Sequence, residues 1–190
     1  MKINYKVSEF IKSAFNKGDH LYDFPQVLFM GKSNVGKSSL INALVEKKNL
    51  AYVSKKPGQT KLVNYYLIDH KFYLVDAPGF GYRRLAYEKD NFENMMNDYL
   101  SDNHQLKLIV YLLDSRRDIT DEEMKTIDYL EQLGYKYTLI FTKCDKLKQS
   151  EKAKLLNMCR KYHIDDYLFT SINVPSTIKS LQDKLQTHLF

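Results

Sequence analysis

The chain has 190 residues, 44% of them hydrophobic, and its 29 lysine and arginine residues outnumber 23 aspartate and glutamate residues, for a formal net charge of +6. This composition predicts a globular chain with a hydrophobic core and excludes disordered, collagen-like and Pro-rich linker classes. The excess positive charge favours an acidic partner, with RNA or DNA as the first candidates.

Strand-length apolar runs alternate with segments of helical periodicity. We expect six strands, at Val27–Met30, Leu62–Ile68, Phe72–Asp76, Leu108–Asp114, Tyr137–Thr142 and Tyr167–Thr170. We expect five helices, at Lys37–Lys47, Leu85–Leu100, Asp121–Leu133, Ser150–Tyr162 and Pro175–Leu189. The third helix has a capping box in Thr120 and Glu123 and should end at Gly134, and Pro175 suits a first helical turn.

The connections between these elements predict the topology. The turn at Asp69 and His70 is too short for a crossover helix, so the second and third strands should pair antiparallel as a hairpin. The other connections contain helices and require parallel strands. The sequence therefore predicts a three-layer α/β fold, with a six-stranded, mostly parallel sheet that has one antiparallel strand. We expect one domain over residues 1–190, with residues 1–24 as an N-terminal extension.

The sequence carries no signal for export or membrane attachment. Its longest apolar run, Leu108–Leu113, is far shorter than the roughly 18 to 20 residues that span a bilayer. The N-terminus lacks the apolar segment of a secretory signal, and the C-terminus has no cysteine for prenylation. Two cysteines, Cys144 and Cys159, are too few for a disulfide scaffold and fit a reducing compartment. We therefore expect a cytoplasmic protein without a membrane partner.

A glycine-rich loop follows the first predicted strand and opens the first helix. It reads GKSNVGKS and matches the phosphate-loop pattern GxxxxGK[ST]. Backbone N–H groups of such a loop converge on phosphate, Lys37 can reach the β and γ oxygens, and Ser38 can bind Mg²⁺. A chance glycine-containing turn is the alternative, which the strand before and the helix after argue against. The candidate nucleotide contacts are Gly31, Lys32, Ser33, Asn34, Val35, Gly36, Lys37, Ser38 and Ser39.

Two further segments are candidates for sensing the γ-phosphate. A DxxG motif ends the third strand; its carboxylate can hold a water of the Mg²⁺ shell and its glycine N–H can meet the γ-phosphate. The segment Asn49–Lys61 is long and polar, of a type that orders with ligand. The DxxG candidates are Asp76, Ala77, Pro78 and Gly79, and those of the long segment are Pro57, Gly58, Gln59 and Thr60. We assign catalytic roles to Lys37, Thr60 and Gly79 and metal roles to Ser38, Thr60 and Asp76, although Thr60 could also be a turn residue.

The choice of base should depend on the tetrapeptide Thr142, Lys143, Cys144 and Asp145, at the end of the fifth strand. A carboxylate can accept from both guanine N1–H and the 2-amino group, a donor pair that adenine lacks. The usual pattern is NKxD, so the Thr142 hydroxyl would have to replace the asparagine contact. A charged loop is the alternative. At the next strand end, a backbone N–H of Thr170, Ser171 or Ile172 could reach guanine O6.

These motifs together resemble a known family. The segments GKSNVGKSSLINAL, KPGQTKLVNYY, LVDAPGFGY, FTKCDKL and FTSI are similar, in this order and spacing, to the EngB (YihA or YsxC) group of bacterial GTP-binding proteins in the TRAFAC class. The resemblance runs from about Phe10 to the final helix and includes the TKxD form. It implies a Ras-like fold, GTP and GDP binding with Mg²⁺, and a role in assembly of the large ribosomal subunit, with ribosomal RNA and ribosomal proteins of its precursor as partners.

Two residues bear on the expected rate of hydrolysis. Phe80 follows Gly79 where Ras-type enzymes have glutamine, and an apolar ring cannot orient the attacking water. We therefore expect slow intrinsic hydrolysis that a partner stimulates, although Phe80 could equally be a packing residue. Asn34 goes, in related TRAFAC GTPases, with a K⁺ ion that bridges the phosphates and can balance transition-state charge. Asparagine is also an ordinary turn former, so K⁺ stays a hypothesis.

Five cations flank the two nucleotide-sensing segments and suggest a surface that faces RNA: Lys55, Lys56, Lys61, Arg83 and Arg84. Neutralising five phosphates would give a log–log salt slope of roughly −3.5 to −4.5. A solvated basic face is the alternative. Two rival functions are a P-loop kinase with a small acceptor and a GTP-dependent signalling module that acts on a protein in cell division or stress control. We expect a monomer.

Overall fold

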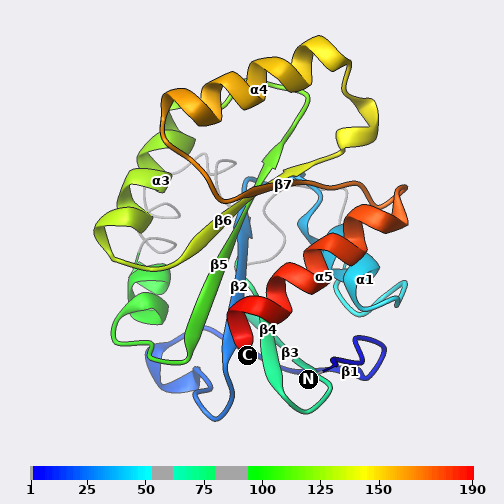
Figure 1. The fold of residues 1–190 in the computed structure, drawn as a ribbon. Helices are drawn as coiled ribbons and strands as arrows, with labels where there is room; N and C mark the ends of the chain where they lie inside the picture. Colours follow the sequence, from blue (N-terminus) through cyan, green and yellow to red (C-terminus); the bar gives the residue numbers. More distant parts are fainter. Residues whose placement is uncertain (1, 53–61, 80–93) are drawn as a thin grey trace.

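A seven-stranded sheet forms the centre of the computed structural model, which describes residues 2–52, 62–79 and 94–190 (Figure 1). The strands are β1 (Ser8–Ala14), β2 (Gln26–Gly31), β3 (Val63–Ile68), β4 (Phe72–Asp76), β5 (Leu106–Asp114), β6 (Tyr137–Thr142) and β7 (Tyr167–Phe169), in the order β1-β3-β4-β2-β5-β6-β7. The helices are α1 (Lys37–Leu44), α3 (Asp121–Gln132), α4 (Gln149–Lys161) and α5 (Pro175–Leu189), with 3-10 turns η1 (Lys17–Asp19) and η2 (Cys144–Lys146). Residues 94–100 are also helical.

Each central strand contributes to two hydrophobic cores, one on each face of the sheet. In β2, Val27 and Phe29 belong to one core, while Leu28 and Met30 belong to the other. This alternation follows from the two-residue period of a strand, and both faces are apolar because helices cover both. Helices α1 and α5 cover the first face, and the helical residues 94–100, α3 and α4 cover the second (Figure 1).

The predicted fold class is confirmed. Strands β3 and β4 form the expected antiparallel hairpin, and β4, β2, β5, β6 and β7 pair in parallel. The structure corrects the strand number, because β1 in the expected N-terminal extension pairs antiparallel with β3 and makes a seventh strand. An edge strand has one neighbour, so most side chains of β1 are not fully buried and its sequence lacks alternation of apolar residues.

The predicted helix ends agree closely with the structure. Helix α1 ends earlier than expected, near Glu46, which adopts φ 53°. Helix α3 begins with the expected capping box, in which Thr120 Oγ1 accepts from the Glu123 N–H at 3.3 Å, and Gly134 follows it at φ 72°. Pro175 is the first residue of α5. Of the predicted helix at Leu85–Leu100, residues 85–93 lie outside the described residues.

No helix in the described ranges combines the length and the apolar character that a bilayer crossing requires. The longest of them, α5, has 15 residues. A membrane-spanning helix needs roughly 20 residues that are mostly apolar. Most residues of α5 instead have polar or charged side chains, such as Lys179 and Asp183, which form an exposed ion pair.

Glu123, at the start of α3, should stabilise the fold at neutral pH and lose this effect in acid. It is fully buried, and its oxygens accept from Arg117 Nη1 and Nη2 at 2.8 and 2.6 Å. Burial by itself raises the pKa of Glu123, but the hydrogen bonds from Arg117 and Thr120 outweigh it and lower that pKa. Glu123→Gln should therefore cost about 2 kcal/mol of unfolding free energy at pH 7.

The cost of Glu123→Gln should depend on pH in one direction. A carboxyl whose pKa is lowered by folding stabilises the protein above the unfolded value of about 4.3 and loses this effect as the pH falls through the folded pKa. Urea unfolding at several pH values measures the difference, with Glu122→Gln as the exposed control. A cost that persists in strong acid would contradict the assignment.

Candidate functional site

The predicted phosphate loop connects the C-terminal end of β2 to the first turn of α1. Gly36 is the N-cap of α1 and adopts φ 104°, a conformation that disfavours residues with a Cβ. Asn34 is exposed and adopts φ 64°, which asparagine tolerates better than most residues. Lys37 and Ser38 are the first two residues of the helix. The loop therefore aims the N–H groups of a helix N-terminus at the C-terminal edge of the sheet, where anions bind readily.

Three side chains tie this loop to other elements. The Thr142 hydroxyl at the end of β6 lies 2.8 Å from the Val35 carbonyl oxygen and 3.2 Å from that of Leu113. Lys143 Nζ donates to the Asn34 carbonyl oxygen at 3.0 Å. Lys32 leaves the loop and reaches the start of α3, where its Nζ lies 2.9 Å from Glu122 Oε2. The predicted residues Thr142 and Lys143 thus support the phosphate loop from behind.

Thr142→Val should lower the unfolding free energy by about 1 to 3 kcal/mol, because it removes the one hydroxyl hydrogen that the buried Val35 and Leu113 carbonyl oxygens share, while side-chain volume is kept. The affinity for guanine nucleotides should also fall, because the lost hydrogen bond holds Val35 in the predicted phosphate loop. Urea unfolding and calorimetry measure the two effects. The matched control is Thr187→Val, which removes an exposed hydroxyl bound to Asp183. Equal losses in the two variants would contradict a supporting role for Thr142.

Lys37 and Asp76 meet beneath the loop. Lys37 Nζ forms an ion pair with Asp76 Oδ1, and the two side chains are only 8% and 3% exposed. Burial raises the pKa of the Asp76 carboxyl, and the neighbouring ammonium opposes this effect. Gly79 of the DxxG motif packs against the same loop, because a Cβ built on it would lie 2.9 Å from Ser33 Oγ and 3.1 Å from Ser33 Cα. Only glycine fits here without a shift of the loop.

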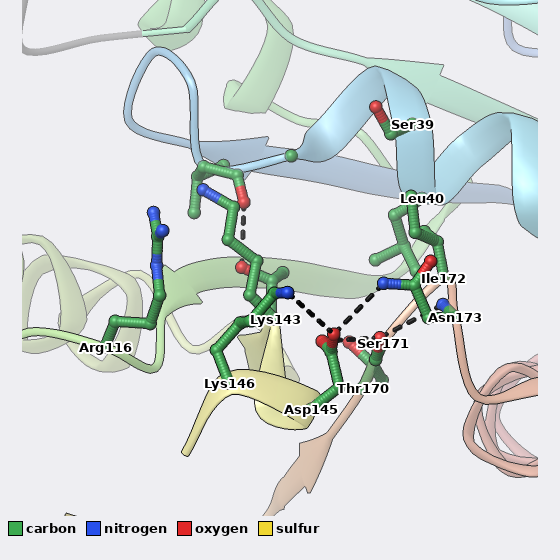
Figure 2. A pocket seen from close by; sticks show the side chains of 13 residues that line it. Ser39, Leu40, Arg116, Lys143, Asp145, Lys146, Thr170, Ser171, Ile172 and Asn173 are labelled. Carbon is green, nitrogen blue, oxygen red and sulfur yellow. Dashed lines mark hydrogen bonds and ion pairs between the residues drawn. The ribbon is translucent and has the colours of Figure 1, made fainter.

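A pocket of about 160 Å³ opens beside the loop (Figure 2). A cavity of about 150 Å³ can hold a benzene ring, so this open pocket has room for a flat base. Predicted residues Val35, Gly36, Ser39, Thr142, Lys143, Asp145, Thr170, Ser171 and Ile172 line it, and Leu40, Arg116, Lys146 and Asn173 line it without having been predicted. The predicted contact Cys144 is half-buried near this pocket and does not line it.

Asp145 lies at one end of the pocket with both carboxylate oxygens engaged (Figure 2). Oδ1 accepts from Ser171 Oγ at 2.7 Å and Oδ2 accepts from Asn173 Nδ2 at 3.0 Å. These two hydrogen bonds, Ser171 first, lower the pKa of Asp145. The group therefore stays a carboxylate, which accepts hydrogen bonds and donates none.

The loop after β7 brings one further N–H group to the pocket. The Thr170 N–H donates to the Phe141 carbonyl oxygen at 2.8 Å, and the Ser171 N–H donates to Thr177 Oγ1 at 3.0 Å. The N–H groups of Thr170 and Ser171 are therefore engaged, and the backbone N–H of Ile172, which lines the pocket, is the candidate left for the predicted contact with guanine O6. It stays a prediction for that residue.

Sequence reasoning missed a charged network beside the pocket. Asp114 ends β5, and its Oδ2 accepts from Lys143 Nζ at 2.7 Å and from Arg116 Nη2 at 2.7 Å. Burial by itself raises the pKa of Asp114, but hydrogen bonds from Arg116 and Lys143 outweigh it and hold that pKa well below its ordinary value. The position of Asp114 at a strand end, next to Thr142 in the β5–β6 register, was the signal that could have found it.

Several predicted residues lie outside the described residues. They are the loop candidates Pro57, Gly58, Gln59 and Thr60, the hydrolysis residue Phe80, and the candidate RNA contacts Lys55, Lys56, Lys61, Arg83 and Arg84. Of the metal candidates, Ser38 and Asp76 are therefore the two that the structure describes. Their roles and those of the remaining residues stay predictions.

The donors present suit Mg²⁺ as part of a nucleotide complex. Within residues 2–52, 62–79 and 94–190, no group of three His, Cys, Asp or Glu side chains could hold a metal ion by itself. Mg²⁺ commonly uses one or two protein oxygens and takes its other ligands from water and substrate phosphates. The Asp76 carboxylate and the Ser38 hydroxyl, both at the phosphate loop, are oxygen donors of that kind.

Comparison with known proteins places the chain in a family. Residues 26–143 match the family described as "50S ribosome-binding GTPase". A relative from Clostridium beijerinckii, named "Probable GTP-binding protein EngB", is 41% identical over 192 residues, which cover 97% of this chain and 94% of the relative.

Solved structures show the same fold. The crystal structure of a probable GTP-binding protein engB is 20% identical, covers 86% of this chain and 98% of its own, and has a TM-score of 0.70. The crystal structure of Era in complex with MgGDPNP and nucleotides 1506–1542 of 16S ribosomal RNA is 18% identical and also has a TM-score of 0.70. The match covers 90% of this chain and 58% of the Era chain. The Ras-like GTPase fold, the matched family and the extent of identity agree, and the chain belongs to the EngB family of GTP-binding proteins.

Proposed function

We propose that this chain binds GTP at the site between α1 and the loops after β6 and β7, and hydrolyses it to GDP and phosphate. The observation that carries the proposal is the placement of a charged carboxylate, Asp145, across one pocket from the phosphate loop. The loop amides and Lys37 would hold the phosphates, because both supply positive partial or full charge. Gly79 would place its N–H near the γ-phosphate, since it packs on Ser33.

Selection of guanine follows from the acceptors at the far end of the pocket. Asp145 offers oxygens to N1–H and the 2-amino group, and an adenine ring would leave these oxygens without donors there. The aliphatic part of Lys143 passes close to Gly36, with Cε 3.8 Å from a Cβ built there, and forms an apolar surface on which a flat base can rest.

A bound Mg²⁺ would neutralise charge on the β and γ oxygens. Ser38 and Asp76 would hold the ion, with Thr60 as a further predicted ligand. In the structure Asp76 is paired with Lys37. Lys37 would therefore turn from the carboxylate to the phosphates when nucleotide binds, which frees Asp76 for the ion.

Calorimetry on ligand-stripped protein tests the proposed binding. GDP and GTP should bind at least about a hundredfold more tightly than ADP and ATP, because an adenine base would cover the Asp145 oxygens without supplying donors to them. Phosphate release from GTP with no added acceptor separates hydrolysis from kinase activity. Equal affinities for guanine and adenine nucleotides would remove the proposal.

We further propose that the output is nucleotide-dependent binding to a precursor of the large ribosomal subunit, with ribosomal RNA as one contact. The description of the matched family and the net charge of +6 support this. The protein should sediment with large-subunit particles with a non-hydrolysable GTP analogue and less with GDP, and binding should weaken steeply with salt. A partner free of RNA would instead favour the signalling module. We expect a cytoplasmic monomer.

Potassium dependence is a separate proposal for the same site. Asn34 lies exposed on the phosphate loop, where a monovalent cation could balance transition-state charge. GTP turnover should then be faster in potassium buffer than in sodium buffer of equal ionic strength. Equal rates would remove K⁺ from the account.

A further inference from the structure

A carboxylate that recognises two donors on one base must be held at one angle. Each carboxylate oxygen has about two lone-pair sites. In the structure, Ser171 Oγ takes one site on Asp145 Oδ1 and Asn173 Nδ2 takes one on Oδ2 (Figure 2). Lys146 Nζ lies 3.9 Å from Oδ2, beyond hydrogen-bond distance, so one site on each oxygen is left. The Asp145 side chain is 19% exposed and lines the pocket. Two remaining sites match the two donors of a guanine edge.

Asn173 acts on this carboxylate twice. Its side-chain amide donates directly to Asp145 Oδ2 at 3.0 Å. Its backbone N–H donates to Ser171 Oγ at 3.0 Å, so the Ser171 hydroxyl hydrogen is directed to Asp145 Oδ1. The side-chain bond is the one that a substitution can remove while the backbone bond stays.

We propose that Asn173 is a specificity-determining residue for guanine, which acts by fixing the orientation of Asp145. This inference rests on the proposed function. A carboxylate turns about its Cβ–Cγ bond as one rigid group, so release of Oδ2 also moves Oδ1. A base with two donors needs both oxygens at fixed positions, because paired parallel hydrogen bonds are geometrically specific. A base with one donor needs only one oxygen, so a carboxylate that rotates can still accept its hydrogen bond.

Inosine diphosphate separates these two cases, because it keeps N1–H and lacks the 2-amino group. Calorimetry with GDP, IDP and ADP should be performed on the wild-type chain, Asn173→Ala and Asn173→Asp. Asn173→Ala should weaken GDP binding about tenfold and IDP binding less than twofold, as expected for loss of one charge-assisted hydrogen bond. Asn173→Asp keeps the side-chain size but replaces the donor with a like charge, and it should weaken GDP binding at least as much.

The control variant is Asn157→Ala, an exposed asparagine on α4 outside the pocket, which should leave all three affinities unchanged. Equal fold losses for GDP and IDP in Asn173→Ala would overturn the inference, because Asn173 would then only pack against the nucleotide. Unchanged or tighter GDP binding would also overturn it, because Asn173 would then compete with the base. A wild-type chain that binds ADP as tightly as GDP would instead remove the proposed function.

Discussion

Asp145→Asn should bind xanthosine diphosphate in preference to GDP, with guanine affinity reduced on the order of a thousandfold. An asparagine amide presents one acceptor and one donor in place of two acceptors. Xanthine presents N1–H and a C2 carbonyl, which complement that pair, whereas the 2-amino group of guanine would face the new amide donor. The two partners of Asp145, Ser171 and Asn173, can accommodate the change, since Asn173 can turn its own amide to offer oxygen.

Calorimetry of ligand-stripped Asp145→Asn with GDP and xanthosine diphosphate measures this exchange. The matched control is Asp183→Asn on α5, whose carboxylate pairs with exposed Lys179 and does not line the pocket. The control should keep the wild-type preference. Retention of wild-type GDP affinity in Asp145→Asn would show that this carboxylate does not contact the base.

Lys37→Met should lower the unfolding free energy of the nucleotide-free chain by about 3 to 5 kcal/mol, because it leaves the buried Asp76 carboxylate without its cation. Methionine keeps most of the aliphatic volume, so packing changes little. Adding Asp76→Asn should recover part of the loss, since the amide carries no charge. The same Lys37 variant should also hydrolyse GTP far more slowly, as the loop loses its mobile cation.

Urea unfolding without nucleotide measures the stability effect. Lys179→Met is the matched control, because it makes the same substitution in an exposed ion pair with Asp183, and it should cost about 0 to 1 kcal/mol. Equal costs in the two variants would mean that the Lys37–Asp76 pair is not a buried interaction in solution.

The sequence predicted the central part of the sheet because those strands are apolar on both faces. A short, nearly continuous apolar run such as Leu108–Leu113 is typical of a strand in a parallel sheet whose two faces are both covered by helices. Strand β1 was not predicted, because most of its side chains stay at least partly exposed and Phe10 is 51% exposed. An edge strand is defined by its partner, here β3, and pairing between residues far apart leaves little trace in composition.

Motifs predicted several of the loops that line the candidate pocket, but not how side chains from different loops pair. Asp114, Arg116 and Asn173 belong to none of the motifs, and their roles arise from contacts across strand ends. Thr142 was expected to face the base, whereas its hydroxyl lies against the Val35 carbonyl oxygen. The direction in which the Thr142 side chain points depends on how β5 and β6 are aligned in the sheet. The motif by itself does not contain that alignment.

The pocket is assembled from residues that lie far apart along the chain, from Val35 to Asn173. During synthesis on the ribosome, a growing chain has its phosphate loop long before it has the loop that holds Asp145 in place. A nascent chain that lacks this loop should therefore not discriminate guanine from adenine at the proposed site. If Asp145 selects the base as proposed, guanine selectivity should appear only after residue 173 has left the exit tunnel.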